Sequence, residues 1–98
     1  MVINRTVNGK KLVIAVEGRL DTVTAPELEA EFSQSLGDAE ELTLDLGKLD
    51  YMSSAGLRLL LLAQKTMMKK GGMEVVNVNS TIMEIFEITG FSDILTIK

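Results

Sequence analysis

Residues 42–72 read LTLDLGKLDYMSSAGLRLLLLAQKTMMKKGG and carry the strongest signals for the fold. Residues 42–46 alternate apolar and polar side chains, which is the period-two pattern of a half-buried strand. Residues 55–70 are rich in strong helix formers and end in two lysines followed by two glycines, a pattern typical of helix C-termini. The stretch therefore predicts a strand, an abrupt polar turn at residues 50–54 and a long central helix. Function is expected at the turn.

Ser53 and Ser54 stand where the predicted helix begins. The first backbone N–H groups of a helix have no partner within the helix, and the helix dipole is positive there, so anions are favoured. In a structural interpretation, a serine is the N-cap and its oxygen accepts a hydrogen bond from one of these N–H groups. In a functional interpretation, a serine hydroxyl is exposed at the corner and receives a phosphoryl group. The tandem pair allows one serine to cap the helix while the hydroxyl of the other is exposed at the corner.

Toward the N-terminus, two apolar segments at residues 2–7 and 11–17 flank Asn8-Gly9. This dipeptide between apolar runs predicts a two-residue type I′ turn, and hence an antiparallel hairpin. Further along, Thr24 and Glu27 form a capping-box pattern, in which each side chain bonds the other residue's backbone N–H at a helix start. A first helix is therefore expected to begin at this point.

Toward the C-terminus, residues 73–78 predict a further strand, and Asn79-Ser80 suits the cap of a helix that ends at Gly90. Residues 94–97 suit a short final turn and an edge strand. Strands separated by helices require parallel crossover connections. We therefore predict one α/β domain over residues 1–98, with an opening antiparallel hairpin, then parallel strands, and helices packed on the mixed sheet.

Composition limits the classes of function. The chain has 98 residues, a net charge of −4 and only 4% aromatic residues, which argues against a nucleic-acid surface. It has no histidine and no cysteine, so histidine-based triads, thiolate nucleophiles and zinc sites built on these residues are excluded. No apolar run approaches the roughly 18 residues of a membrane span. We expect a cytoplasmic protein without metal or cofactor, and a protein or small-molecule partner.

Four segments, in order and at matching spacings, carry a resemblance to a known family. They are Gly18-Arg19-Leu20-Asp21; Leu44-Asp45-Leu46 with Tyr51-Met52-Ser53-Ser54-Ala55-Gly56-Leu57; Lys69-Lys70-Gly71-Gly72; and Phe86-Glu87-Ile88-Thr89-Gly90-Phe91. Over nearly its whole length the chain resembles the STAS domain, the fold of the bacterial anti-sigma-factor antagonists. The resemblance implies the same mixed sheet that the order of elements predicts.

The resemblance also implies a phosphoacceptor, which falls on Ser54, with Ser53 as the second choice. The chain departs from the family pattern at three positions. Ser53 stands where the family usually has aspartate, Ala55 where it has serine or threonine, and Arg58 where it has glycine. The missing aspartate weakens the case for the standard kinase interaction. Arg58 is placed to pair with a phosphate or with an acidic partner.

The function implied is that of an adaptor and not of an enzyme. The unphosphorylated protein would bind a GHKL-type serine kinase that doubles as the anti-sigma factor, and so release the sigma factor. Phosphorylation of Ser54 would break the complex, and a serine phosphatase would reset it. The expected docking surface comprises Asp21, Met52, Ser53, Ala55, Gly56, Leu57 and Arg58. Asp21 is equally suited to cap its own turn.

Two alternatives remain at this stage. The missing aspartate favours a constitutive STAS subunit that binds an ABC-transporter ATPase or a signalling scaffold. An enzyme or nucleotide-binding domain is least favoured, because the chain has no Gly-x-x-x-x-Gly-Lys-(Ser/Thr) loop. A monomer or a weak dimer is expected, with no nucleic-acid or membrane partner.

Overall fold

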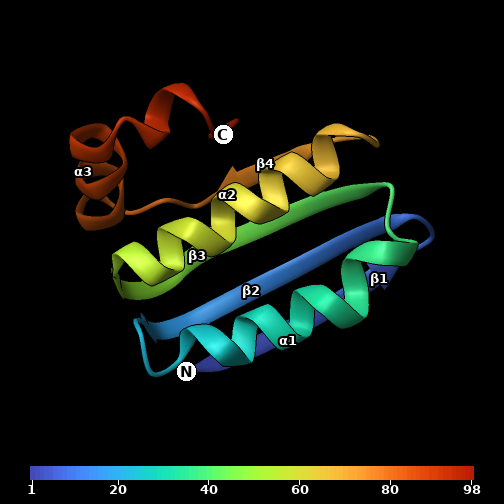
Figure 1. The fold of residues 1–98 in the computed structure, drawn as a ribbon, viewed down its shortest axis with the longest axis horizontal. Helices are drawn as coiled ribbons and strands as arrows, with labels where there is room; N and C mark the ends of the chain where they lie inside the picture. Colours follow the sequence, from blue (N-terminus) through green and yellow to red (C-terminus); the bar gives the residue numbers. More distant parts are fainter.

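A mixed sheet forms the centre of the computed structural model, which describes residues 1–98 (Figure 1). Its four strands are β1 (Val2–Asn8), β2 (Lys11–Leu20), β3 (Glu41–Met52) and β4 (Met73–Val76), in the spatial order β1-β2-β3-β4. β1 is antiparallel to β2, whereas β2 and β3, and then β3 and β4, are parallel. The predicted α/β fold, with an opening hairpin followed by parallel strands, is confirmed.

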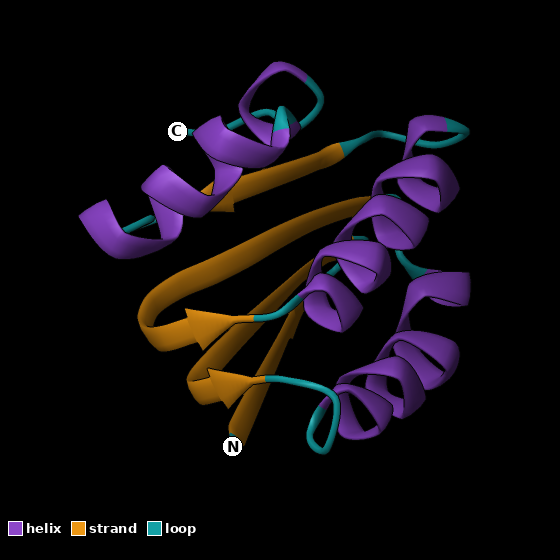
Figure 2. Cartoon of the chain, turned by 60° about the vertical axis from the view of Figure 1, so that its left-hand side comes forward, coloured by secondary structure: helices purple, strands orange, loops and turns teal.

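Three α-helices follow the second, third and fourth strands. They are α1 (Ala25–Ser35), α2 (Ser54–Met68) and α3 (Ser80–Thr89), with short 3-10 helices η1 (Leu36–Asp38) and η2 (Phe91–Asp93) after the first and the last. Figure 2 shows α1 and α2 side by side on one face of the sheet, with α3 apart from them near β4. The C-terminal ends of β2 and β3 thus lie close to the starts of α1 and α2, respectively.

The apolar faces of β2, β3 and α2 supply much of the core. Leu42, Leu44 and Leu46 on β3 are at most 1% exposed, as their period-two spacing predicts. From the helix side, Leu60 and Met67 on α2 are completely buried. The predicted central helix is therefore confirmed, and together with α1 it covers this face of the sheet.

The hairpin turn lies one residue later than predicted. Asn8 pairs with Lys11 in the ladder between β1 and β2, so the two loop residues are Gly9 and Lys10. Of these, Gly9 alone has a positive φ, of 64°. A positive φ at the first loop residue alone is the pattern of a type II′ turn, whereas type I′ needs it at both positions. The hairpin is confirmed, and its predicted turn type is wrong.

The abrupt turn predicted at residues 50–54 is also wrong, because β3 continues to Met52 and α2 begins at Ser54. The pairing of β2 with β3 shifts register twice, between Ala15 and Glu17 and between Gly18 and Arg19. Such bulges interrupt the alternation of buried and exposed side chains. The second half of β3 therefore lacks the period-two pattern by which a strand is recognised in a sequence.

The two ends of α3 match the prediction, but the final edge strand does not form. At the start of α3, the Asn79 carboxamide oxygen accepts a hydrogen bond from the Ile82 amide at 2.9 Å, while its nitrogen donates to the Leu49 carbonyl at 2.8 Å. At its end, Gly90 has a φ of 81°. Beyond η2, one parallel bridge joins Ile97 to Val75, and no longer strand forms over residues 94–97.

Candidate functional site

Ser54 is the first residue of α2, at the corner where β3 passes into the helix. Ser53 precedes it as the N-cap, with extended backbone at φ −92° and ψ 176°. The Ser53 amide donates to the Leu20 carbonyl at the end of β2, at 2.9 Å, and the Ser53 carbonyl accepts from the Leu57 amide at 3.0 Å. These bonds fasten the corner to both neighbouring elements, so Ser54 has a fixed position.

The two serines differ in exposure. The Ser53 side chain makes no capping bond, and its Oγ is buried without a hydrogen-bond partner. The prediction that a serine caps the helix through its oxygen is therefore wrong, although Ser53 occupies the N-cap position. Ser54 is exposed, and its hydroxyl is the one available at a helix N-terminus.

Three residues assigned to the docking surface from the sequence are buried. Met52 is 2% exposed and Leu57 is 7% exposed, and Gly56, in the first turn of α2, is also buried. These three residues therefore belong to the packing under the corner, and their assignment to an exposed docking surface is corrected. The alternation within the motif did not reveal this, because β3 and α2 meet here and neither periodicity extends across the junction.

The exposed part of the corner is smaller than the motif. Ser54 and Arg58 are exposed one helical turn apart, while Ser53 and Ala55 are partly buried. Asp21, in the loop between β2 and α1, is also partly exposed beside them, since Leu20 pairs with Met52. We call the surface formed by Asp21, Ser53, Ser54, Ala55 and Arg58 the serine corner.

Asp21 caps its own turn, which was one of its two predicted roles. Its Oδ1 accepts hydrogen bonds from the backbone amides of Val23 and Thr24, both at 3.0 Å. In return, the Thr24 hydroxyl accepts from the Asp21 amide at 2.9 Å and donates to the Arg19 carbonyl at 2.7 Å. The predicted capping box with Glu27 is wrong, because the Thr24 hydroxyl is used within this turn and makes no capping bond to α1.

The turn predicts a specific response to acid. The Thr24 amide above all, and then the Thr24 hydroxyl, the Val23 amide and the Arg19 charge, lower the pKa of Asp21 below its usual value. A carboxylate with a depressed folded-state pKa stabilises the fold above its unfolded pKa of about 3.9, and this contribution disappears as pH falls through the folded value. The Asp21→Asn variant should therefore be less stable than wild type at pH 7, with the difference closing toward pH 2 in urea unfolding. A gap of equal size at both pH values would contradict the prediction.

Arg19 and Tyr51 lie beside the serine corner, and the sequence analysis did not single them out as site residues. They are register partners at the ends of β2 and β3. The Arg19 guanidinium carbon lies 4.4 Å from the centre of the Tyr51 ring, and its Nε lies 3.6 Å from Asp21 Oδ2. These residues are distant in the chain, and only the register with its bulge brings them together, so no local pattern could have identified the pair.

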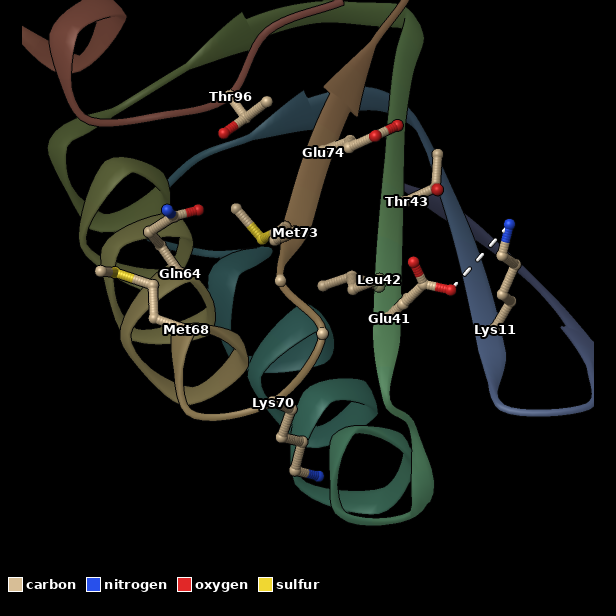
Figure 3. Close-up of a pocket in the computed structure, with 12 residues that line it drawn as sticks. Lys11, Glu41, Leu42, Thr43, Gln64, Met68, Lys70, Met73, Glu74 and Thr96 are labelled. Carbon is tan, nitrogen blue, oxygen red and sulfur yellow. Dashed lines mark ion pairs between the residues drawn. The ribbon is translucent and has the colours of Figure 1, made fainter.

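A cavity of about 440 Å³ lies at the other end of the sheet. It is lined by the first residues of β3 and β4 and by the last turns of α2, where Figure 3 shows Gln64 and Met68 beside Met73. None of the serine-corner residues lines it.

No group of three or more aspartates or glutamates is placed to hold a metal ion. No helix has the length and apolar character needed to cross a bilayer. The candidate site is the serine corner, where Ser54 is exposed at the start of α2.

Comparison with known sequences identifies the family. The family model described as "Mlab, STAS domain" matches residues 3–96. BtrV of Bordetella bronchiseptica, named as a candidate anti-sigma factor antagonist, is 36% identical over 88 residues, which cover 88% of this chain and 76% of BtrV. The anti-sigma-B factor antagonist of Bacillus subtilis is 28% identical over 92 residues, covering 93% of this chain and 84% of that protein.

Solved structures show the same fold. An anti-sigma factor antagonist from Mycobacterium paratuberculosis matches with a TM-score of 0.89 and 25% identity, over 98% of this chain and 83% of that one. The Bacillus cell fate determinant SpoIIAA, in its phosphorylated form, matches with a TM-score of 0.76 and 20% identity, over 99% and 91% of the two chains. The sequence and fold together place the chain: it belongs to the STAS domain family of anti-sigma-factor antagonists.

Proposed function

We propose that the chain is an anti-sigma-factor antagonist switched by phosphorylation of Ser54. In its unphosphorylated form it binds a GHKL-type serine kinase that serves as the anti-sigma factor, and the bound sigma factor is released. Transfer of a phosphoryl group to Ser54 ends this binding, and a serine phosphatase restores it. The chain itself carries out no catalysis. The observation that carries the proposal is the exposed Ser54 hydroxyl on the first residue of a 15-residue helix.

The electrostatics of the corner support Ser54 as the acceptor. A phosphoserine carries about −1.5 to −2 charges at pH 7, and the free amides and positive dipole of a helix N-terminus stabilise such an anion. Arg58 is exposed one turn further along α2 and adds a cation on that side. Ser53 lacks these advantages because its Oγ is buried. SpoIIAA, which shares the fold, has been solved in both phosphorylated and unphosphorylated forms.

The proposal is tested by intact mass and site mapping after incubation with ATP and the GHKL-type serine kinases of the source genome, one at a time. Wild type and Ser53→Ala should each gain one phosphate, whereas Ser54→Ala should gain none. Ser53→Ala is the matched control, since it removes a neighbouring hydroxyl that is not exposed. No phosphate on wild type, with kinases shown to be active on another substrate, would contradict the proposal.

One observation favours a second candidate, a constitutive STAS subunit bound to an ABC-transporter ATPase or a signalling scaffold. Ser53 stands where the family usually has aspartate, which weakens the case for the standard kinase interaction. This candidate predicts stable co-purification with the ATPase, and no change in that association for Ser54→Asp. The switched antagonist instead predicts that Ser54→Asp weakens binding to the kinase. The same variant therefore distinguishes the two candidate functions.

A further inference from the structure

Arg19 is held in place on two sides before any partner arrives. Its guanidinium lies over the Tyr51 ring at 4.4 Å, and its Nε faces Asp21 Oδ2 at 3.6 Å. Both residues remain open to solvent. The Arg19 side chain is 62% exposed, and Tyr51 as a whole is 37% exposed. An arginine fixed in this way has already lost much of the side-chain freedom that binding would otherwise cost.

The backbone directs this arrangement. The register of β2 against β3 shifts between Gly18 and Arg19, so that Arg19 pairs with Tyr51. Gly18 has a φ of 96°, a conformation that side-chain-bearing residues rarely adopt. Bulges of this kind turn a side chain to a new direction and occur often beside functional sites. The bulge here places Arg19 next to Tyr51, and Tyr51 precedes Ser54 by three residues in the chain.

The free edge of the guanidinium determines what it can bind. The one polar contact of the Arg19 side chain runs from Nε to Asp21 Oδ2. The two terminal nitrogens of the guanidinium make no hydrogen bond within the chain. Two parallel N–H groups in one plane match a carboxylate in a bidentate pair. Arginine and tyrosine are also the residue types that most often dominate the binding energy of protein interfaces. The pair is therefore suited to an aspartate or glutamate of a protein partner.

We propose that the Arg19–Tyr51 pair is a specificity-determining contact of the serine corner, which binds a carboxylate on the anti-sigma kinase. This inference rests on the proposed function. Arg19 makes the contact, and Tyr51 is a positioning residue that acts through Arg19 by holding its guanidinium flat. Ser54 receives the phosphate, whereas the pair selects which kinase docks.

The test measures the Kd of the unphosphorylated chain for the kinase that phosphorylates it, by calorimetry at one fixed salt concentration. Arg19→Ala should weaken binding about 30-fold, the factor that corresponds to a hot-spot residue of about 2 kcal/mol. Tyr51→Ala should weaken it about 10-fold, and Tyr51→Phe, which keeps the ring, should restore binding to within about 2-fold. The matched control is Lys65→Ala, which removes an exposed cation from the last turn of α2.

The double variant separates a positioning role from independent contacts. If Tyr51 acts through Arg19, Arg19→Ala combined with Tyr51→Ala should bind no more than about 3-fold more weakly than Arg19→Ala alone. Fully additive losses, or unchanged binding in Arg19→Ala, would overturn the inference while the proposed function stands. A wild-type chain that no serine kinase binds or phosphorylates would overturn both. Thermal unfolding of each variant shows that the altered protein is folded.

Discussion

Replacing Gly56 with alanine should lower the free energy of unfolding by about 2 kcal/mol, although alanine is the better helix former. An alanine Cβ here would lie 2.7 Å from Cγ of Leu20 and 2.9 Å from Cγ of Met52. Both of those side chains are buried, at 0% and 2% exposed, so neither can move into free space. Overpacking costs about 1–3 kcal/mol, which outweighs the gain of at most about 1 kcal/mol in helix propensity.

The measurement is equilibrium unfolding in urea, with a fall of about 10 °C in Tm as the thermal counterpart. Gly37→Ala is the matched control, because nothing lies within 4 Å of its added Cβ and its φ is not positive. That substitution should leave stability unchanged or raise it by up to about 1 kcal/mol. Equal stability of wild type and Gly56→Ala would show that the helix can shift outward at no cost.

Gly56 matters for function because it sets how closely α2 approaches the ends of β2 and β3. Ser54 lies two residues earlier in the same turn, and Ser53 is bonded to Leu20. A helix start that moved outward would therefore carry the Ser54 hydroxyl with it. Gly56→Ala should reduce the rate of Ser54 phosphorylation more than a variant of similar stability altered elsewhere in the core.

Elements with a regular period could be predicted from the sequence. Leu42, Leu44 and Leu46 fall on one face of β3 because their spacing matches the pleat, and the long apolar run after them forms α2. The Asn79 cap was also predictable, since its hydrogen bond spans three residues. In each case the deciding interaction is local or strictly periodic. Such interactions leave a pattern that a single sequence can show.

The features that were missed depend on contacts between distant segments. The sequence predicts a turn at the end of β3 because the register shifts against β2 break its alternation. The spacing of Thr24 and Glu27 predicts a capping box, yet the Thr24 hydroxyl bonds the Asp21 amide and the Arg19 carbonyl in the turn. The Arg19–Tyr51 pair requires the register itself. The position of Ser54 was predictable through the motif, whereas the burial of Met52 beneath it was not.

Phosphorylation of Ser54 should weaken binding of the kinase at least about 100-fold, which corresponds to about 2.8 kcal/mol. The added group brings up to two negative charges to a surface that a partner must desolvate, and it stands beside Asp21 on a protein whose net charge is already −4. A partner carboxylate held by Arg19 would also be repelled by the phosphate. Like charges brought together in an interface cost several kcal/mol, so the loss should exceed that of any single substitution at the corner.

The pH dependence gives the sharpest test of this mechanism. The second pKa of a phosphoserine is about 6, so the phosphorylated chain should recover part of its affinity between pH 7.5 and pH 5.5, as the group loses one charge. Ser54→Ala should bind the kinase as tightly as the unmodified wild type, because it adds neither bulk nor charge. The affinity of Ser54→Asp should fall between those of the unmodified and the phosphorylated wild type. If bulk alone broke the complex, the phosphorylated chain would bind equally weakly at both pH values. If phosphorylation left the Kd unchanged, Ser54 would be a modified residue that does not act as a switch, and the constitutive subunit would be the better account.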